Sequence, residues 1–282
     1  MEELNVKRLE KALSLKRNIV GVHFLAYKME YDESPVAPSE KRGSFCSFVN
    51  RASRGEHFKI NAQHFTCQGG ASSIGVTEET EDRRTGRLYQ HCGLYSSHAI
   101  ARLVNSSMNH IPHKIYGVEI GPLSAVESAD VVIIIATAKQ CMRLIQGYTY
   151  EYGPATHLST VGNQAACSDL CAKPFVNNDL NISFMCCGMR MCTQADDGEM
   201  GVGLPIQMFS KVTNGVLQTL NLTEQNKYIL SLSAELEDPD ELGIELRLDE
   251  GYGKNAQKYE DEARKMAEAE EAYFAGLESS SN

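Results

Sequence analysis

Several features that would assign this chain of 282 residues to a familiar class are missing from its sequence. The longest apolar run, Val131–Ala136, is far too short to span a bilayer, and the charged N-terminus has no apolar segment of the signal-peptide kind. The net charge of −10 argues against non-specific nucleic-acid binding, which needs clustered Lys and Arg. The sequence therefore predicts a cytoplasmic protein that binds neither membranes nor nucleic acids.

The motifs of three large enzyme classes are also missing. No GxGxxG sequence follows a predicted strand, and neither GxxxxGKS, GxxxxGKT nor GxSxG occurs anywhere. These absences exclude a nicotinamide dehydrogenase with the usual dinucleotide-binding motif, a P-loop NTPase and a serine hydrolase of the nucleophile-elbow type.

The chain does have nine cysteines, four of which lie in two similar segments. The first segment runs from Cys46 to Cys67 and the second from Cys167 to Cys186. Each opens with Cys-Ser and a helix-like run, passes through a polar turn into a short alternating strand, and closes on Cys-x-Gly. If the two segments face each other, four sulfurs meet at one point.

Hydrophobic periodicity predicts an α/β or α+β domain over residues 1–220, with a mixed sheet, flanking helices and an internal pseudo-repeat of the two cysteine segments. Strands are expected over 19–27, 59–61, 115–120, 131–136, 156–161, 180–184 and 199–204. Helices are expected over 2–14, 46–53, 94–104, 139–150, 163–171 and 206–220. Residues 31–43 read as a loop because of two prolines and several charges. Residues 221–282 are expected to form an acidic, largely helical extension that packs on its own domain or pairs two copies of the chain.

A series of short motifs, in order along the chain, is similar to those of one known family. They are Cys46, Arg54-Gly55-Glu56, Cys67-Gln68-Gly69-Gly70-Ala71, Asp130-Val131-Val132, Gln140-Cys141-Met142-Arg143-Leu144, Cys167, Asn181-Ile182-Ser183, Cys186-Cys187-Gly188-Met189-Arg190, Asp197-Gly198-Glu199-Met200 and Gly203-Leu204-Pro205. Over residues 5–220 the chain thereby resembles the domain-of-unknown-function family 169, DUF169, which is widespread in anaerobic bacteria and archaea. The resemblance implies a shared core and shared cysteines, with Cys186 rather than Cys187 as the counterpart of Cys67, but no reaction.

Four thiolates suit either zinc or an iron–sulfur cluster. Zinc ribbons usually take their ligands from closely spaced pairs of cysteines, whereas the four cysteines of the two segments are widely spaced single residues. The pattern therefore favours an iron–sulfur cluster, of the 4Fe-4S type, bound by Cys46, Cys67, Cys167 and Cys186. Gly69 and Gly70 would bring backbone N–H groups close to it.

Other residues leave alternatives open. Cys171, Cys187 and Cys192 form a competing sulfur set. His64 and Arg190 are candidate catalytic groups, because His64 shortly precedes Cys67 and Arg190 shortly follows Cys186. The leading hypothesis is an iron–sulfur redox protein or small-molecule-transforming enzyme of anaerobic metabolism, an oxidoreductase or a lyase. Its substrate or electron-transfer partner is not identified by the sequence. A non-catalytic protein that binds a soft metal or a thiol-reactive ligand is the alternative, and cysteines that only fill the core are a third reading.

Overall fold

The computed structural model describes residues 2–112, 114–192, 195–219, 264–265 and 268. The chain divides into two units, Met1–Thr219 and Leu220–Asn282, and only the first is described below. The acidic C-terminal extension, and its suggested role in pairing two copies, lie almost wholly outside the described residues. The boundary near residue 220 therefore stays a prediction.

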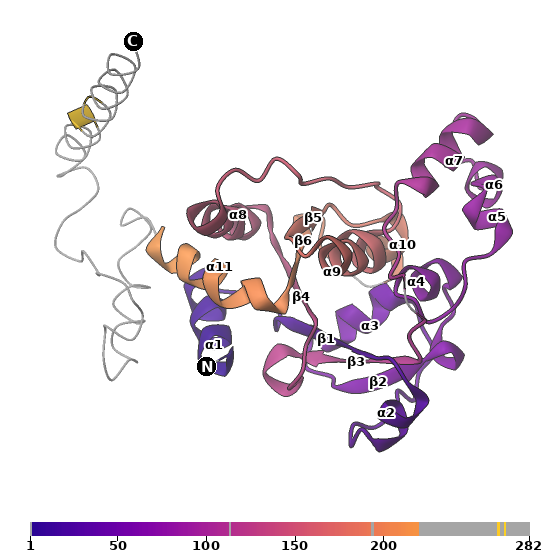
Figure 1. Ribbon diagram of the computed structural model, residues 1–282, viewed down its shortest axis with the longest axis horizontal. Coiled ribbons are helices and arrows are strands. Elements are labelled where there is room, and N and C mark those ends of the chain that lie inside the picture. The colour runs from indigo at the N-terminus through magenta and orange to yellow at the C-terminus, as the bar shows by residue number, and fades with distance from the viewer. Residues whose placement is uncertain (1, 113, 193–194, 220–263, 266–267, 269–282) are drawn as a thin grey trace, which may run out of the picture. The chain divides into compact units, whose positions relative to one another are not determined.

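Six strands form one sheet in the order β2-β3-β1-β4-β6-β5 (Figure 1). The strands are β1 (Val20–Leu25), β2 (Phe58–Asn61), β3 (Gly117–Pro122), β4 (Val131–Thr137), β5 (Asn181–Ser183) and β6 (Glu199–Pro205). The α+β prediction is confirmed, but the sheet is antiparallel at every pair of neighbouring strands rather than mixed. The reason is topological. Helices connect β1 to the parallel strand β2, and β4 to the parallel strand β5, with a gap left between the two strands each time. The next strand, β3 or β6, fills that gap and is antiparallel to both of its neighbours.

The sheet is covered on both faces, and β4 shows this most clearly. Val131, Ile133 and Ile135 belong to the core on one face, whereas Val132 and Ile134 belong to the core on the other. This alternation confirms the prediction that the β-branched run is a strand buried on both sides. Among the described residues, no helix has the length and apolarity needed to cross a membrane.

The helices divide between the two faces (Figure 1). One face carries α1 (Glu2–Leu13), α8 (Ala138–Tyr152) and α11 (Ile206–Gln218). The other carries α3 (Phe45–Ala52), α4 (Gln68–Ser73), the π-helix η3 (Ala165–Ala172), α9 (Lys173–Asn177) and α10 (Cys187–Cys192). The remaining short helices are α2 (Lys28–Glu33), η1 (Ala62–His64), α5 (Glu81–Arg84), α6 (Arg87–His91), α7 (His98–Ser106) and η2 (Leu123–Ala125). Of these, α5, α6 and α7 form a small cap beside α4 and α10.

Two sequence predictions are wrong locally. Residues 156–161 are not a strand, because buried side chains bind their backbone in place of a neighbouring strand: Asn181 Nδ2 donates to Ser159 O at 2.9 Å, and Asn181 Oδ1 accepts from Ser159 N at 3.0 Å. The loop expected from residue 31 begins later, because α2 continues to Glu33.

The two halves of the sheet repeat one topology. Each half runs from an inner strand (β1 or β4) to an edge strand (β2 or β5) and then to the strand between them (β3 or β6). Because β1 and β4 are antiparallel neighbours, the axis that relates the halves is perpendicular to the sheet. A rotation about such an axis keeps each element on its own face, so the two cysteine segments lie on the same side of the sheet.

Close packing of η3 on β6 depends on glycine. A Cβ atom at Gly203 would stand 2.0 Å from the backbone oxygen of Leu170, which lies on η3. The π-helix therefore contacts the backbone of β6 directly, and this contact fixes the height of Cys167 above the sheet.

Candidate functional site

Cys46, Cys67, Cys167 and Cys186 line one cavity of about 530 Å³ on the face of the sheet that carries α3 and η3. Each of these cysteines stands at the start of a different helix. Cys46 is the second residue of α3 and Cys167 the third residue of η3, while Cys67 caps α4 and Cys186 immediately precedes α10. The structure thus brings together the four cysteines that the two sequence segments singled out.

Cys67 and Cys186 make the same contact in the two halves. The sulfur of Cys67 accepts a hydrogen bond from Gly70 N at 3.5 Å, and the sulfur of Cys186 accepts one from Met189 N at 3.4 Å. In each case a sulfur satisfies one of the backbone N–H groups that the first turn of a helix leaves without an intrahelical partner. Each sulfur thus lies at the N-terminal end of a short helix and accepts a hydrogen bond from its backbone.

Cys46 and Cys186 are paired by a hydrogen bond across the two halves. This bond lowers the pKa of the Cys186 thiol to about 5, against the effect of burial, and backbone N–H groups of Ala165, Met189 and Gly188 add to the lowering. The same bond, together with burial, raises the pKa of Cys46 well above its ordinary value. The hydrogen bond therefore favours the proton on Cys46 and the thiolate form of Cys186.

Cys167 differs from Cys186 because it lacks such a set of donors. Its sulfur lies 3.6 Å from Gln164 Oε1, to which the thiol donates, and burial is the main cause of a raised pKa. The four sulfurs thus comprise a stabilised thiolate and at least two buried thiols.

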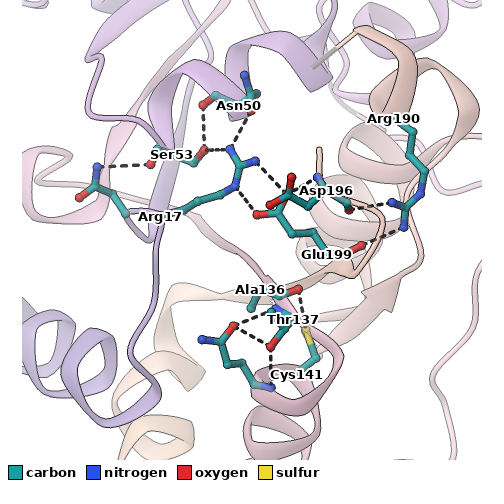
Figure 2. A network of polar contacts seen from close by, with 11 residues as sticks. Arg17, Asn50, Ser53, Ala136, Thr137, Cys141, Arg190, Asp196 and Glu199 are labelled. Atoms are coloured by element: carbon teal, nitrogen blue, oxygen red, sulfur yellow. Dashed lines mark hydrogen bonds and ion pairs between the residues drawn. The ribbon is translucent and has the colours of Figure 1, made fainter. Parts of the chain in front are cut away.

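The other cysteines lie elsewhere in the described part of the chain. Cys171 lies on η3, is fully buried and does not line the cavity, and burial raises its pKa well above the ordinary value. Cys92 and Cys187 are exposed. Cys141 is buried in the opposite core, where its thiol points to Ala136 O at 3.8 Å (Figure 2) and burial raises its pKa to about 12. The side chain of Cys192 lies outside the described residues.

No group of three or more His, Cys, Asp or Glu side chains in the described ranges is placed to hold a metal ion. The four cysteines of the cavity therefore share a cavity without yet converging on a single point.

His64 and Arg190, the two candidate catalytic residues, are not among the residues that line this cavity. His64 Nδ1 lies 2.9 Å from Asn61 Oδ1 and accepts from Asn61 N at 3.1 Å, which closes the turn of η1. Arg190 donates to the backbone oxygen of Phe184 at 2.9 Å. It also donates to that of Glu199 at 2.8 Å, as Figure 2 shows. Both side chains thus hold the loops that carry Cys67 and Cys186.

Several polar residues of the cavity were not found from the sequence: Arg42, Arg83, Tyr89, Asn163 and Gln164. Gln164 Nε2 donates to the Tyr89 hydroxyl at 2.7 Å, and Gln164 Oε1 accepts from the Ser73 hydroxyl. Burial raises the pKa of Tyr89. The position of Gln164, three residues before Cys167, was the only local hint, because the others come from the cap helices or from loops with no cysteine pattern.

Gly69 and Gly70 both line the cavity, as expected for residues next to Cys67. Gly70 supplies the N–H group that binds Cys67. Gly69 leaves room for an arginine, because a Cβ atom there would stand 2.6 Å from Arg83 Nη1.

The sequence profile of the DUF169 family, described as "Uncharacterised ArCR", matches residues 8–215. The match covers both cysteine segments and the whole six-stranded sheet. No curated protein and no solved structure matches the chain.

Proposed function

This chain belongs to the DUF169 family, and because the family's description carries no reaction, we propose from the cavity itself that the protein binds an iron–sulfur cluster through Cys46, Cys67, Cys167 and Cys186. The observation that carries the proposal is the gathering of these four cysteines, from four separate helix starts, around one cavity. Thiolate sulfur is the usual ligand of such clusters.

The surroundings of the sulfurs also support a cluster. Backbone N–H groups of Gly70 and Met189 already bind two of the sulfurs, and hydrogen bonds of this kind tune the potential of a bound cluster. Arg42 on the cavity wall would offset part of the negative charge of a cluster with four thiolate ligands. Phe45 and Ala166, which belong to the apolar core beneath the site, give it an apolar floor.

Loading would change the sulfurs' present contacts. The hydrogen bond between Cys46 and Cys186 would be replaced by bonds to iron, and the thiols of Cys46 and Cys167 would lose their protons. Since their pKa values are raised, loading releases protons and is favoured by higher pH.

A bound cluster would supply one-electron transfer, or an iron acting as a Lewis acid if one cysteine is displaced. Four cysteine ligands favour electron transfer, whereas three leave one iron open to act as a Lewis acid. We accordingly propose an oxidoreductase or lyase of anaerobic metabolism as the class, and a cytoplasmic location, where thiols remain reduced. The free state of the eight cysteines that the structure describes agrees with that location.

The test is anaerobic purification, followed by a visible spectrum and measurement of iron and acid-labile sulfide before and after reconstitution. Wild-type protein is expected to be coloured and to hold iron and sulfide in equal amounts. Single Cys→Ser changes at the four positions should reduce the iron content, whereas Cys92→Ser and Cys187→Ser should not, since both side chains are exposed. A protein that stays colourless and iron-free after reconstitution would sink the proposal.

The alternative, a protein that binds a thiol-reactive ligand, has one observation in its favour. Cys186 is a thiolate at neutral pH and lines a cavity that a small molecule can enter. Under this alternative, Cys186 attacks an electrophilic ligand directly. Mass spectrometry of the apoprotein after exposure to small electrophiles would then show a single adduct at Cys186, in protein that never takes up iron.

A further inference from the structure

The cavity over the four cysteines has a polar wall whose charge is opposite to that of the chain. The sequence contains 37 Asp and Glu against 27 Lys and Arg. The residues that line the cavity nevertheless include Arg42 and Arg83, and no Asp or Glu is among them in the described part of the chain. Cys186, whose lowered pKa favours a thiolate, also lines the cavity, but the two arginines still attract negatively charged ligands to the wall that carries them.

Two buried donors of residues on this wall, Arg83 Nε and Asn163 Nδ2, make no hydrogen bond of regular geometry. The Asn163 side chain lies near the Tyr95 hydroxyl and interacts with it, whereas Arg83 Nε has no such neighbour. Buried polar atoms in folded proteins are nearly always paired, and both of these atoms can only donate. Arg83 Nε therefore lacks an oxygen acceptor, and Asn163 Nδ2 lacks a well-placed one.

The geometry of Arg83 indicates the kind of acceptor. Its Nη1 donates to the Tyr89 hydroxyl at 3.0 Å, which leaves the opposite edge of the guanidinium, made of Nε and Nη2. Arg17 uses this same edge to bind both oxygens of Glu199, with 2.6 Å from Nε and 2.8 Å from Nη2 (Figure 2). The edge is a planar fork that matches a carboxylate.

Neighbouring groups hold Arg83 in place. Its guanidinium carbon lies 5.6 Å from the centre of the Tyr89 ring, and the Tyr89 hydroxyl is fixed in turn by Gln164. The absence of a side chain at Gly69 makes space for Nη1. A cavity of about 530 Å³ also falls within the usual range for small-molecule sites, roughly 300–1,000 Å³.

We infer that this cavity binds a small organic carboxylate, which the Nε edge of Arg83 and the amide of Asn163 hold beside the four cysteines. The inference deepens the proposed function, and it rests on that function because the carboxylate would occupy the same cavity as the cluster. None of the carboxylate's partners is a cysteine, so its binding is measurable in the iron-free protein as well.

The test is calorimetric titration of the full-length apoprotein with acetate, pyruvate, succinate and benzoate, and with inorganic phosphate. At least one carboxylate is expected to bind more tightly than phosphate. Arg83→Met should weaken that binding at least tenfold, and Arg83→Lys should restore it only in part, because an ammonium group lacks the fork. Arg84→Met is the matched control: Arg84 is exposed on the same helix, pairs with Glu81, and should leave the affinity unchanged.

Asn163→Ala provides a second variant that leaves the arginine in place, and it should weaken carboxylate binding several-fold. Thermal unfolding establishes that each variant is folded before it is titrated. Absence of carboxylate binding by wild-type protein, tighter binding of phosphate, or equal binding by wild type and Arg83→Met would each overturn the inference.

Iron and sulfide content separates this inference from the cluster proposal. Arg83→Met is expected to keep the iron content of reconstituted wild type while losing carboxylate affinity. A Cys46→Ser protein that loses iron and still binds carboxylate supports the inference independently of the cluster. Arg83→Met could instead lose its iron while wild type binds no carboxylate. Arg83 would then stabilise the bound cluster and bind no carboxylate, so the inference would fail while the proposed function stands.

Discussion

Cys46 and Cys186 come from opposite halves of the chain, and the thiol of Cys46 donates a hydrogen bond to the sulfur of Cys186. The lowered pKa favours the thiolate of Cys186, which is the form of a cysteine that reacts with electrophiles. It also couples the two cysteine segments before any ligand is present.

The pH dependence of alkylation tests this coupling. The pKa of Cys186 is lowered to about 5, so its thiolate is fully formed above pH 6 and is lost as the pH falls through about 5. Iodoacetamide should therefore label Cys186 in the apoprotein at a rate that is level from pH 6 to pH 8, as followed by mass spectrometry. A free cysteine thiol, with a pKa of about 8.5, gains reactivity throughout that interval and serves as the control.

Removal of the donor should reverse the effect. In Cys46→Ala protein the midpoint of Cys186 alkylation is expected to move to higher pH, because the first cause of the low pKa has been removed. A midpoint that stays near 5 in this variant would show that the backbone N–H groups alone hold the thiolate.

Cys186 and Cys187 are adjacent, yet they should differ in iron binding. Cys186 lines the cavity and Cys187 is exposed, so Cys186→Ser should lose at least half of the iron taken up on reconstitution while Cys187→Ser loses none. Iron and sulfide analysis of the two proteins side by side is the measurement. If Cys187→Ser lost the iron and Cys186→Ser did not, the iron ligand would be Cys187 and the assignment to Cys186 would be wrong.

Gly203→Ala tests the packing that sets the height of Cys167. A Cβ atom 2.0 Å from the backbone oxygen of Leu170 cannot be accommodated by rotation of a side chain, so η3 must move away from β6. We expect a loss of about 3 kcal/mol in the free energy of unfolding. Gly198→Ala is the control, because nothing lies within 4 Å of a Cβ atom there. Equal urea midpoints for the two variants would contradict the close contact.

Arg17→Met tests the ion pair between Arg17 and Glu199, which also involves Asn50 of α3 through a hydrogen bond of 2.9 Å (Figure 2). Both side chains of the ion pair are about 10% exposed. Removing one partner of a largely buried pair is expected to cost about 3 kcal/mol of unfolding free energy at pH 7. The exposed pair of Arg84 and Glu81 supplies the control, since Arg84→Met should cost about 0.5 kcal/mol or less.

The same pair has a predicted pH dependence. Burial raises the pKa of Glu199, but hydrogen bonds from Arg17 and from the backbone of Asp196 together hold the value below the ordinary 4.5. The stabilisation is therefore complete above pH 4.5 and is lost as the pH falls through the lower folded-state value. Urea unfolding at several pH values should show the gap between wild type and Arg17→Met narrowing below pH 4.5. A gap that is constant down to pH 3 would assign the effect to packing instead.

The sequence predicted the elements of the fold better than their arrangement. Residues 131–136 form a strand because their β-branched side chains pack on two cores at once, which a local pattern reveals. The antiparallel sheet was not predictable from local sequence, because it depends on β3 lying between β1 and β2 and on β6 lying between β4 and β5. Nor was the loop over residues 156–161, whose backbone is held by Asn181 from more than 20 positions away.

The sulfur residues of the site could be predicted, whereas its polar wall could not. Cys46, Cys67, Cys167 and Cys186 recur in two similar segments, so their spacing carried the information. Arg83 and Tyr89 lie on α5 and α6, which have no counterpart in the second half and no motif of their own. They reach the cavity only because the cap folds back over Gly69, a tertiary contact.

The repeated topology of the sheet has a consequence for how such a site is inherited. A chain of half this length would carry only two of the four cysteines and would have to pair with a second copy to complete the cavity. In such a pair every wall would occur twice. Within one chain the two halves can differ, and the helices α5 to α7 have no counterpart in the second half. The cavity therefore has a single arginine-bearing wall, so that its two sides are chemically different.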